Sequence, residues 1–256
     1  MKKLTAIIFF LFCFLFAFTQ EEADSYRPFR FGIKAEPNMG WLKPETSTFK
    51  YKKPSLGFAY GIMMDIGLGS NNYALATGLE VVYLGGTIEY PNYVKVDNIG
   101  YVGLTEAKYN MQYVNIPLHL KLKTNEIGYL TYFAHMGIDA GMKLKANANV
   151  SSMLAGVSSQ FEYSEKKIDV SKETKLFRPA MCIGIGAEYN ISGNTSIVFG
   201  ASFHNGFTNV FSKNKVVYKV DNKGNVLTHP SGEPLKDDKK AHALTNYIAL
   251  TVGIFF

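Results

Sequence analysis

Residues 247–256 read YIALTVGIFF, and this stretch decides the fold. Large apolar side chains stand at every second position from Ile248 to Phe256, whereas the positions between them include the small residues Ala249 and Gly253. An alternation with a period of two predicts a β-strand whose two faces meet different surroundings. The segment ends on an aromatic residue, and we expect this strand to close a barrel against the first strand.

Seven more segments show the same alternation. Tyr and Phe occur 16 and 19 times, and such residues favour strands. No run of about 18 apolar residues follows residue 20, so a transmembrane helix is not expected there. We therefore expect an all-β chain with eight strands, near 28–41, 57–68, 73–90, 108–123, 129–146, 176–190, 195–209 and 242–256.

The two faces of these segments differ in side-chain size. In the segment 129–146, one face carries large apolar residues from Leu130 to Leu144, whereas the other carries glycines with His135 and Asp139. Lipid offers the backbone no hydrogen-bond partner, so a sheet with such a face closes into a barrel with that face outward. A soluble, lipocalin-like barrel is the alternative, but its outer face would then be rich in Gly and Ala. We predict an eight-stranded antiparallel transmembrane β-barrel.

The first residues have the pattern of a secretory signal peptide. Lys2 and Lys3 precede an apolar run over residues 4–18, and the small residues Ala17 and Thr19 stand three and one positions before Gln20. A retained membrane anchor is the alternative. We expect a signal peptide at 1–19 and a barrel domain at 20–256, in which Cys182 is the single cysteine and no internal disulfide is possible.

The connections between the predicted strands alternate in length. Short periplasmic turns and long extracellular loops are typical of outer-membrane barrels, so both termini are expected in the periplasm of a Gram-negative cell. A β-hairpin is expected around residues 221–224, and a bulge at Pro117, which cannot donate to a ladder. The long loops are expected near 42–56, 91–107, 147–175 and 210–241.

Ten charged or histidine side chains share the parity of the small, inward face. Side chains just fill the interior of an eight-stranded barrel, and an isolated charge there is unfavourable unless it is paired. Since both signs occur, we predict a hydrogen-bonded ion network in the lumen and no open pore. The predicted network comprises Arg30, Lys34, Asp65, Glu80, His119, Lys121, His135, Asp139, Lys143 and Glu188.

No motif of an enzyme or a cofactor site occurs. The chain lacks a Gly-rich phosphate loop and a Gly-x-Ser-x-Gly elbow. His119, His135 and His204 are candidates for a metal or catalytic site, but we interpret them as polar filling of a narrow barrel. His204 and Asp139, the candidates near the rim, fall on strands that give neither a clear partner. We predict no catalytic, cofactor-binding or metal-binding residues.

The formal net charge of +6 lies mostly in the predicted loops. It neither follows a helix face nor interleaves with aromatic residues, so nucleic acid is not an expected partner. The expected partners are outer-membrane lipid and, through the loops, other secretion or envelope proteins.

Several segments, taken in order, resemble the PorT-like outer-membrane β-barrel family of the Bacteroidetes. The resemblance covers nearly the whole of residues 20–256, and an Ile-Pro-Leu sequence at the centre of one strand is its most recognisable part. The segments are Phe31-Gly32-Ile33-Lys34-Ala35, Thr77-Gly78-Leu79-Glu80-Val81-Val82-Tyr83 with Gly85-Gly86, Tyr113-Val114-Asn115-Ile116-Pro117-Leu118-His119-Leu120-Lys121, Gly184-Ile185-Gly186-Ala187-Glu188-Tyr189 and Gly206-Phe207-Thr208-Asn209-Val210.

The resemblance implies a barrel in the outer membrane, and the namesake of the family is needed for protein export by the type IX secretion system. Three functions are considered. The first is a non-enzymatic secretion-accessory or envelope protein, the second a small channel or porin-like protein, and the third an outer-membrane enzyme. The crowded lumen disfavours the second, and the lack of a site disfavours the third.

Overall fold

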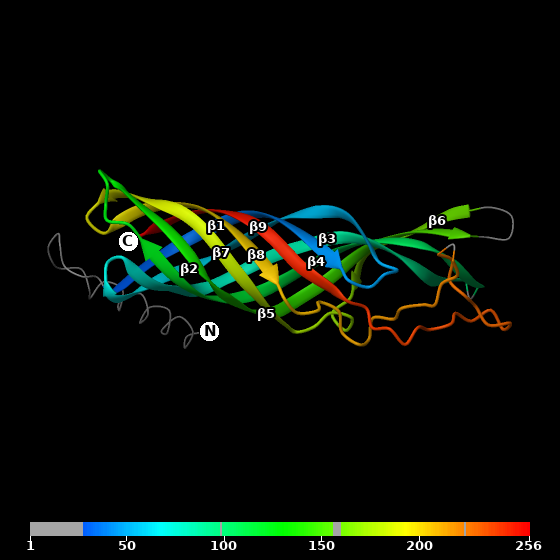
Figure 1. The fold of residues 1–256 in the computed structure, drawn as a ribbon. Helices are drawn as coiled ribbons and strands as arrows, with labels where there is room; N and C mark the ends of the chain where they lie inside the picture. Colours follow the sequence, from blue (N-terminus) through cyan, green and yellow to red (C-terminus); the bar gives the residue numbers. More distant parts are fainter. Residues whose placement is uncertain (1–27, 98, 156–159, 223) are drawn as a thin grey trace, which may run out of the picture.

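The computed structural model describes residues 28–97, 99–155, 160–222 and 224–256, so the predicted signal peptide at 1–19 lies outside the described residues. Within these residues, nine strands form one antiparallel sheet, and eight of them close into a barrel (Figure 1). The order around the barrel is β1-β2-β3-β4-β5-β7-β8-β9, so the predicted ring of eight strands is confirmed. The strands are β1 (Phe29–Pro44), β2 (Lys50–Ser70), β3 (Tyr73–Val96), β4 (Ile99–Lys123), β5 (Leu130–Ala155), β6 (Gln160–Asp169), β7 (Phe177–Ser192), β8 (Thr195–Gly206) and β9 (Ala243–Phe255).

Closure joins the first strand to the last. Ile33 of β1 lies opposite Ile62 of β2 on one side and Ile254 of β9 on the other. Each strand of the ring is therefore paired on both edges, and its backbone polar groups find partners without water. Among the described residues, no helix is long and apolar enough to cross a membrane.

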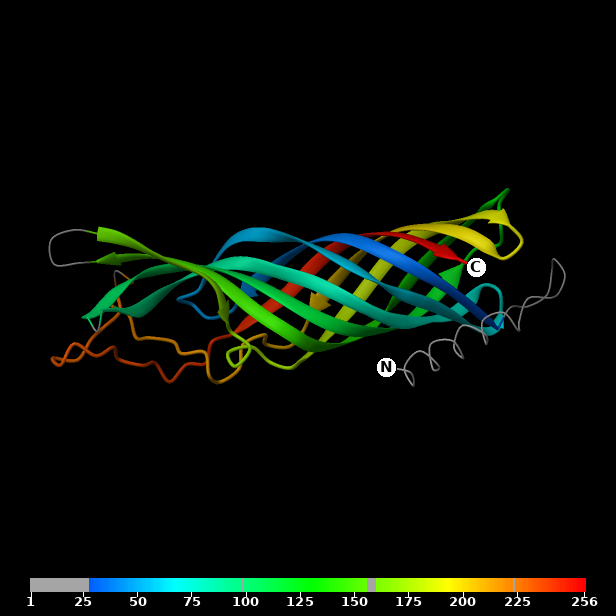
Figure 2. The same ribbon diagram turned by 180° about the vertical axis from the view of Figure 1, so that it is seen from behind.

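The two ends of the barrel differ. The short connections after β2, β4 and β7 lie at one end together with Phe29 and Phe255, and we call this the turn end. At the opposite end, which we call the extended end, hairpins and residues 210–241 project beyond the ring, as the view from behind also shows (Figure 2). Both described ends of the chain thus lie on the side of the short turns.

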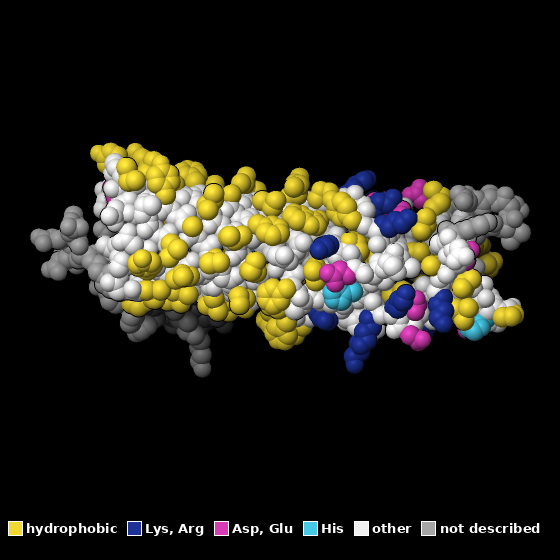
Figure 3. Space-filling view, viewed as in Figure 1, with side chains coloured by type: hydrophobic (Ala, Val, Ile, Leu, Met, Phe, Trp, Pro, Cys, Tyr) yellow, Lys and Arg dark blue, Asp and Glu magenta, His cyan; other side chains and the backbone are white. Residues whose placement is uncertain are grey.

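The outer surface changes in character along the barrel. Large apolar side chains cover the half that includes the turn end, whereas Lys, Arg, Asp and Glu gather toward the extended end (Figure 3). Ile138 illustrates the alternation, since it is 50% exposed while its neighbour Asp139 is fully buried. An apolar band of this kind is the surface that lipid covers.

The strands at the extended end are longer than the alternation predicts. Residues 91–107 were expected as a loop, but β3 and β4 remain paired as far as Val96 and Ile99. In the expected loop 147–175, β5 continues and β6 adds a ninth strand that pairs only with β5. These extensions lie beyond the apolar band, so neither of their faces needs to be apolar. Their sequence therefore lacks the apolar alternation, although the backbone pairing continues.

A bulge in β5 marks the start of this extension. Gln112 and Tyr113 of β4 are adjacent but pair with Lys145 and Lys143, so Leu144 is the extra residue. One extra residue reverses the parity of everything that follows. Odd-numbered residues such as Asp139 are therefore buried before the bulge, and even-numbered residues such as Ala146 are buried after it.

Pro117 does not produce the predicted bulge. It stays in register opposite Asp139 of β5, and the β3–β4 register is the same on both sides of it. The ladder between Thr77–Leu118 and Glu80–Asn115 is interrupted, which is the local effect of the missing N–H.

Residues 210–222 and 224–241 form no strand of the sheet, and they run out along the extended end and return to β9 (Figure 1). The predicted hairpin is present as a short ladder: an antiparallel bridge joins Val220 to Val226, Asp221 N–H donates to the carbonyl of Asn225, and Leu227 N–H donates to that of Lys219. The start of this segment is tied to the barrel wall, because Val210 N–H donates to the carbonyl of Ala243 at 2.8 Å.

Candidate functional site in the barrel interior

The interior near the turn end is crossed by a chain of ion pairs. Lys121 of β4 donates to Asp65 of β2 at 2.7 Å and to Glu188 of β7 at 2.6 Å, and Arg30 of β1 meets Glu188 at 2.6 Å. We call these four residues the ionic chain. Because they come from strands on different sides of the ring, their bonds run across the lumen rather than along its wall.

Aromatic rings pack against the ionic chain. The Lys121 ammonium lies 4.5 Å from the ring centre of Phe133 and 4.9 Å from that of Phe255, and the Arg30 guanidinium lies 4.3 Å from Phe255. Phe133 and Phe255 form a small buried cluster with Met63 and Val198. A cation is attracted to the face of an aromatic ring, and the attraction is stronger where water is excluded. The two rings therefore stabilise the Lys121 and Arg30 cations and fill the interior beside them.

A second group of ion pairs is centred on Lys34. Its ammonium meets Glu80 at 2.6 Å and Glu36 at 3.1 Å, and the Thr251 hydroxyl donates to Glu36 at 2.6 Å. Glu36 is absent from the predicted network although it shares the parity of Arg30 and Lys34. The parity of β1 is therefore the signal that would have identified it.

Five further side chains form what we call the histidine cluster: His119, His135, Asp139, Cys182 and His204. Asp139 accepts from His119 Nε2 at 2.8 Å and from His204 Nδ1 at 2.6 Å. Cys182 Sγ lies 3.6 Å from His135 Nε2 and 3.7 Å from His204 Nε2. The rings of His119 and His135 stack with their centres 5.1 Å apart.

The expectation that Asp139 and His204 lack partners is wrong. They lie on β5 and β8, which are separated in the ring only by β7, and both side chains point into a narrow lumen. The spacing of histidines along the chain carried no sign of this, because the cluster joins four strands. The parity of Cys182, which matches that of Glu188 on the same strand, was the available signal.

Lys143 is not part of either charged group. It follows Gly141 on the inward face of β5 but lies just before the bulge, and it is half-buried. Its ammonium donates to the carbonyls of Ser171 and Thr174 at 2.7 and 2.6 Å. Lys143 therefore holds the connection between β6 and β7 against the rim.

The extended end of the lumen is closed by what we call the apolar plug. The centre of the Phe211 ring lies 5.4 Å from the ring centre of Tyr109 and 6.0 Å from that of Phe49, and both contacts are edge-to-face. Most residues of the plug are far apart in the sequence, and the alternation along single strands did not predict that they meet. Its buried members include Phe49, Tyr90, Tyr109, Val210, Phe211 and Val217.

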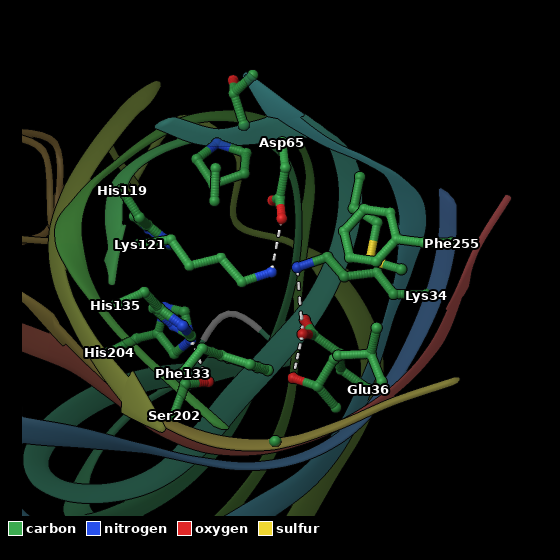
Figure 4. A pocket seen from close by; sticks show the side chains of 17 residues that line it. Lys34, Glu36, Asp65, His119, Lys121, Phe133, His135, Ser202, His204 and Phe255 are labelled. Carbon is green, nitrogen blue, oxygen red and sulfur yellow. Dashed lines mark hydrogen bonds and ion pairs between the residues drawn. The ribbon is translucent and has the colours of Figure 1, made fainter. Parts of the chain in front are cut away.

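Two hollows lie in the described interior. One of about 70 Å³ is lined by His119, His135 and His204, together with Lys34 and Lys121 (Figure 4). A larger hollow of about 570 Å³ lies at the turn end. Asp65 lines both, so the ionic chain stands between them.

The closed ring, its apolar band and its filled interior define the class of small outer-membrane β-barrels. The chain belongs to the family described as "Outer membrane protein beta-barrel domain", whose model matches residues 18–212. Membership indicates a location in the outer membrane.

The chain also matches solved structures of outer-membrane barrels. They include Neisserial surface protein A (10% identity, 88% of this chain and 97% of that chain, TM-score 0.37) and OprG from Pseudomonas aeruginosa (7%, 91% and 98%, TM-score 0.40). Ail, the attachment invasion locus protein of Yersinia pestis, is a third (10%, 89% and 97%, TM-score 0.31). A search of curated proteins finds no significant match.

Proposed function

We propose that this chain is a sealed, non-enzymatic outer-membrane barrel that binds another protein at its extended end, as a secretion-accessory or envelope protein. The resemblance to the PorT-like family suggests protein export by a type IX system as the setting. In this proposal both termini are periplasmic and the extended end is extracellular.

The observation that carries the proposal is the closure of the lumen at two levels. The ionic chain crosses it near the turn end, and the apolar plug fills it at the extended end. A solute would have to break buried ion pairs and then displace packed aromatic rings. This arrangement supports a role at the surface of the barrel over the porin-like alternative.

The length of the strands supports a working surface at the extended end. A tilted transmembrane strand needs about 9–11 residues, whereas β4 and β5 have 25 and 26. The extensions are stably paired, since Thr105 and Ser152 bridge β4 and β5 by a buried 2.7 Å hydrogen bond. Such long paired strands exceed what a barrel needs for closure.

The extensions also offer features that suit a protein partner. Among the described residues, no strand pairs with the edge of β6 that faces away from β5, or with the edge of residues 90–96 of β3 that faces away from β4. Open strand edges accept an added strand from a partner. Leu104 and Met153 lie opposite each other and are 48% and 52% exposed, which gives an apolar contact next to these edges.

Site-specific photo-crosslinking in the native host tests this proposal. A crosslinker at Met153 should yield a discrete adduct with one envelope or secreted protein, whereas the same crosslinker at Ile127, exposed at the turn end, should not. Replacing residues 151–164 by a two-residue turn should reduce secretion or envelope integrity while the barrel still shows a heat-dependent shift on a gel. Unchanged secretion, surface proteins and envelope integrity in a strain without the gene would contradict the proposal.

A further inference from the structure

The histidine cluster brings together the side chains that bind thiophilic metal ions. His119, His135 and Cys182 each offer a ligand atom, and these atoms all lie within 4.8 Å of one another. Asp139, Cys182 and His204 form a second such group, so the Cys182 sulfur is common to both. Thiolate and imidazole are the ligands that zinc and similar ions prefer.

The distance between Cys182 Sγ and His135 Nε2 agrees with that of a metal site. In a tetrahedral zinc site, bonds of about 2.3 Å to sulfur and about 2.0–2.1 Å to nitrogen put these two ligands roughly 3.5 Å apart. Cys182 Sγ lies 3.6 Å from His135 Nε2. The same separation fits a thiol–imidazole hydrogen bond, and it is also the spacing that an ion bound to both atoms requires.

Asp139 provides the outer support that histidine ligands usually have. Metal-bound histidines typically donate their second N–H to a carboxylate, which fixes the ring. Asp139 accepts from His119 at 2.8 Å and from His204 at 2.6 Å and is fully buried. Its carboxylate and the Cys182 sulfur would together balance a divalent charge.

The contacts distinguish the two groups of possible ligands. Asp139 and His204 are 2.6 Å apart, which is closer than the roughly 3.4 Å between two ligands of one zinc ion. His204 Nε2 is also held, since it lies 2.8 Å from the Ser202 hydroxyl. Among the described contacts, His135 has no hydrogen-bond partner other than Cys182.

We propose that the barrel interior binds one zinc-class divalent ion through Cys182, His135 and His119, with Asp139 as the positioning carboxylate. The hollow of about 70 Å³, lined by both histidines, is large enough for water at a fourth position. The ion would tie β4, β5 and β7 together inside the membrane. This inference does not depend on the partner proposed for the extended end.

The test uses the full chain, purified in detergent and folded in the presence of Co²⁺ or Zn²⁺. Wild-type protein should retain about one ion per chain, and Co²⁺ should give a near-ultraviolet thiolate charge-transfer band. Cys182→Ser should abolish the band, and His135→Gln should weaken binding at least tenfold. His204→Gln should retain the ion, as should His229→Gln, an exposed control in the segment 210–241.

A second measurement needs no variant. Bound Zn²⁺ should slow the reaction of Cys182 with a thiol reagent in mildly unfolding conditions. Each variant is checked for a heat-dependent gel shift, so a folding failure is recognised as such. The proposal is overturned if the folded wild-type protein retains no ion and shows no protection, or if Cys182→Ser binds as well as wild type. Loss of the ion in His204→Gln but not in His135→Gln would overturn the assignment of ligands.

Discussion

Replacing Lys121 by Met tests whether the ionic chain stabilises the barrel. The substitution keeps a long apolar side chain and removes only the ammonium group. Lys121 meets two carboxylates, at 2.7 Å for Asp65 and 2.6 Å for Glu188. Glu188 keeps its 2.6 Å contact with Arg30 after the change, but Asp65 loses its only ion pair among the described residues.

The expected loss of stability follows from this difference. Removing one partner of a buried ion pair costs about 3–5 kcal/mol, because the remaining charge is left without compensation. Asp65 is buried, so the free energy of unfolding of Lys121→Met should fall by roughly this amount. Adding Asp65→Asn removes the uncompensated charge, and the double variant should be less destabilised than additivity predicts, by about 0.5–3 kcal/mol.

Urea unfolding of the barrel in lipid vesicles measures both effects. Trp41 is the only tryptophan of the chain and stacks on Phe203, so its fluorescence reports on the closed barrel. Lys123→Met, which removes an ammonium outside the ionic chain, is the matched control and should cost much less. A loss below about 1 kcal/mol for Lys121→Met, or strict additivity of the two changes, would refute the reasoning.

Three further predictions concern the wall, the plug and the lumen. Ile138→Arg places a charge in the apolar band and should lower the free energy of unfolding by about 2–4 kcal/mol. Ile127→Arg at the turn end should cost little, and equal effects of the two changes on unfolding in vesicles would show that the band is misplaced. Phe211→Ala should lower the free energy of unfolding by about 3–5 kcal/mol and make residues 212–240 more sensitive to protease. Val216→Ala, at an exposed position, should do neither, and an unchanged cleavage rate for Phe211→Ala would argue against the plug. The wild-type barrel should show no steady conductance in planar bilayers, and a large, stable conductance would restore the porin-like interpretation.

The fold could be predicted from the sequence because a barrel strand meets two environments. The alternation from Ile248 to Phe256 reflects lipid on one face and a crowded lumen on the other, and no tertiary contact is needed to recognise it. The same parity correctly assigned Lys121, Asp139 and Glu188 to the interior. A period of two is a property of one strand and its surroundings, so the sequence alone carries it.

The alternation fails to predict structure where a strand leaves the apolar band, because its surroundings change there. Beyond the apolar band both faces of β5 are polar or mixed, so neither its extension nor the pairing of β6 was expected. The bulge at Leu144 reverses the parity, and no residue type in the sequence marks it. The position of Phe211 in the plug depends on how residues 210–241 fold back, which strand periodicity does not describe.

The partners of the inward side chains were decided only by the tertiary structure. Asp139 of β5 meets His204 of β8, and Lys121 of β4 meets Glu188 of β7, across strands that are not neighbours in the sequence. Which inward residues share a level depends on the tilt and stagger of the closed ring. The sequence by itself determined that these groups are inside and that both charge signs are present. Only closure of the barrel determined which of them touch, because it brings strands far apart in the chain around one narrow lumen.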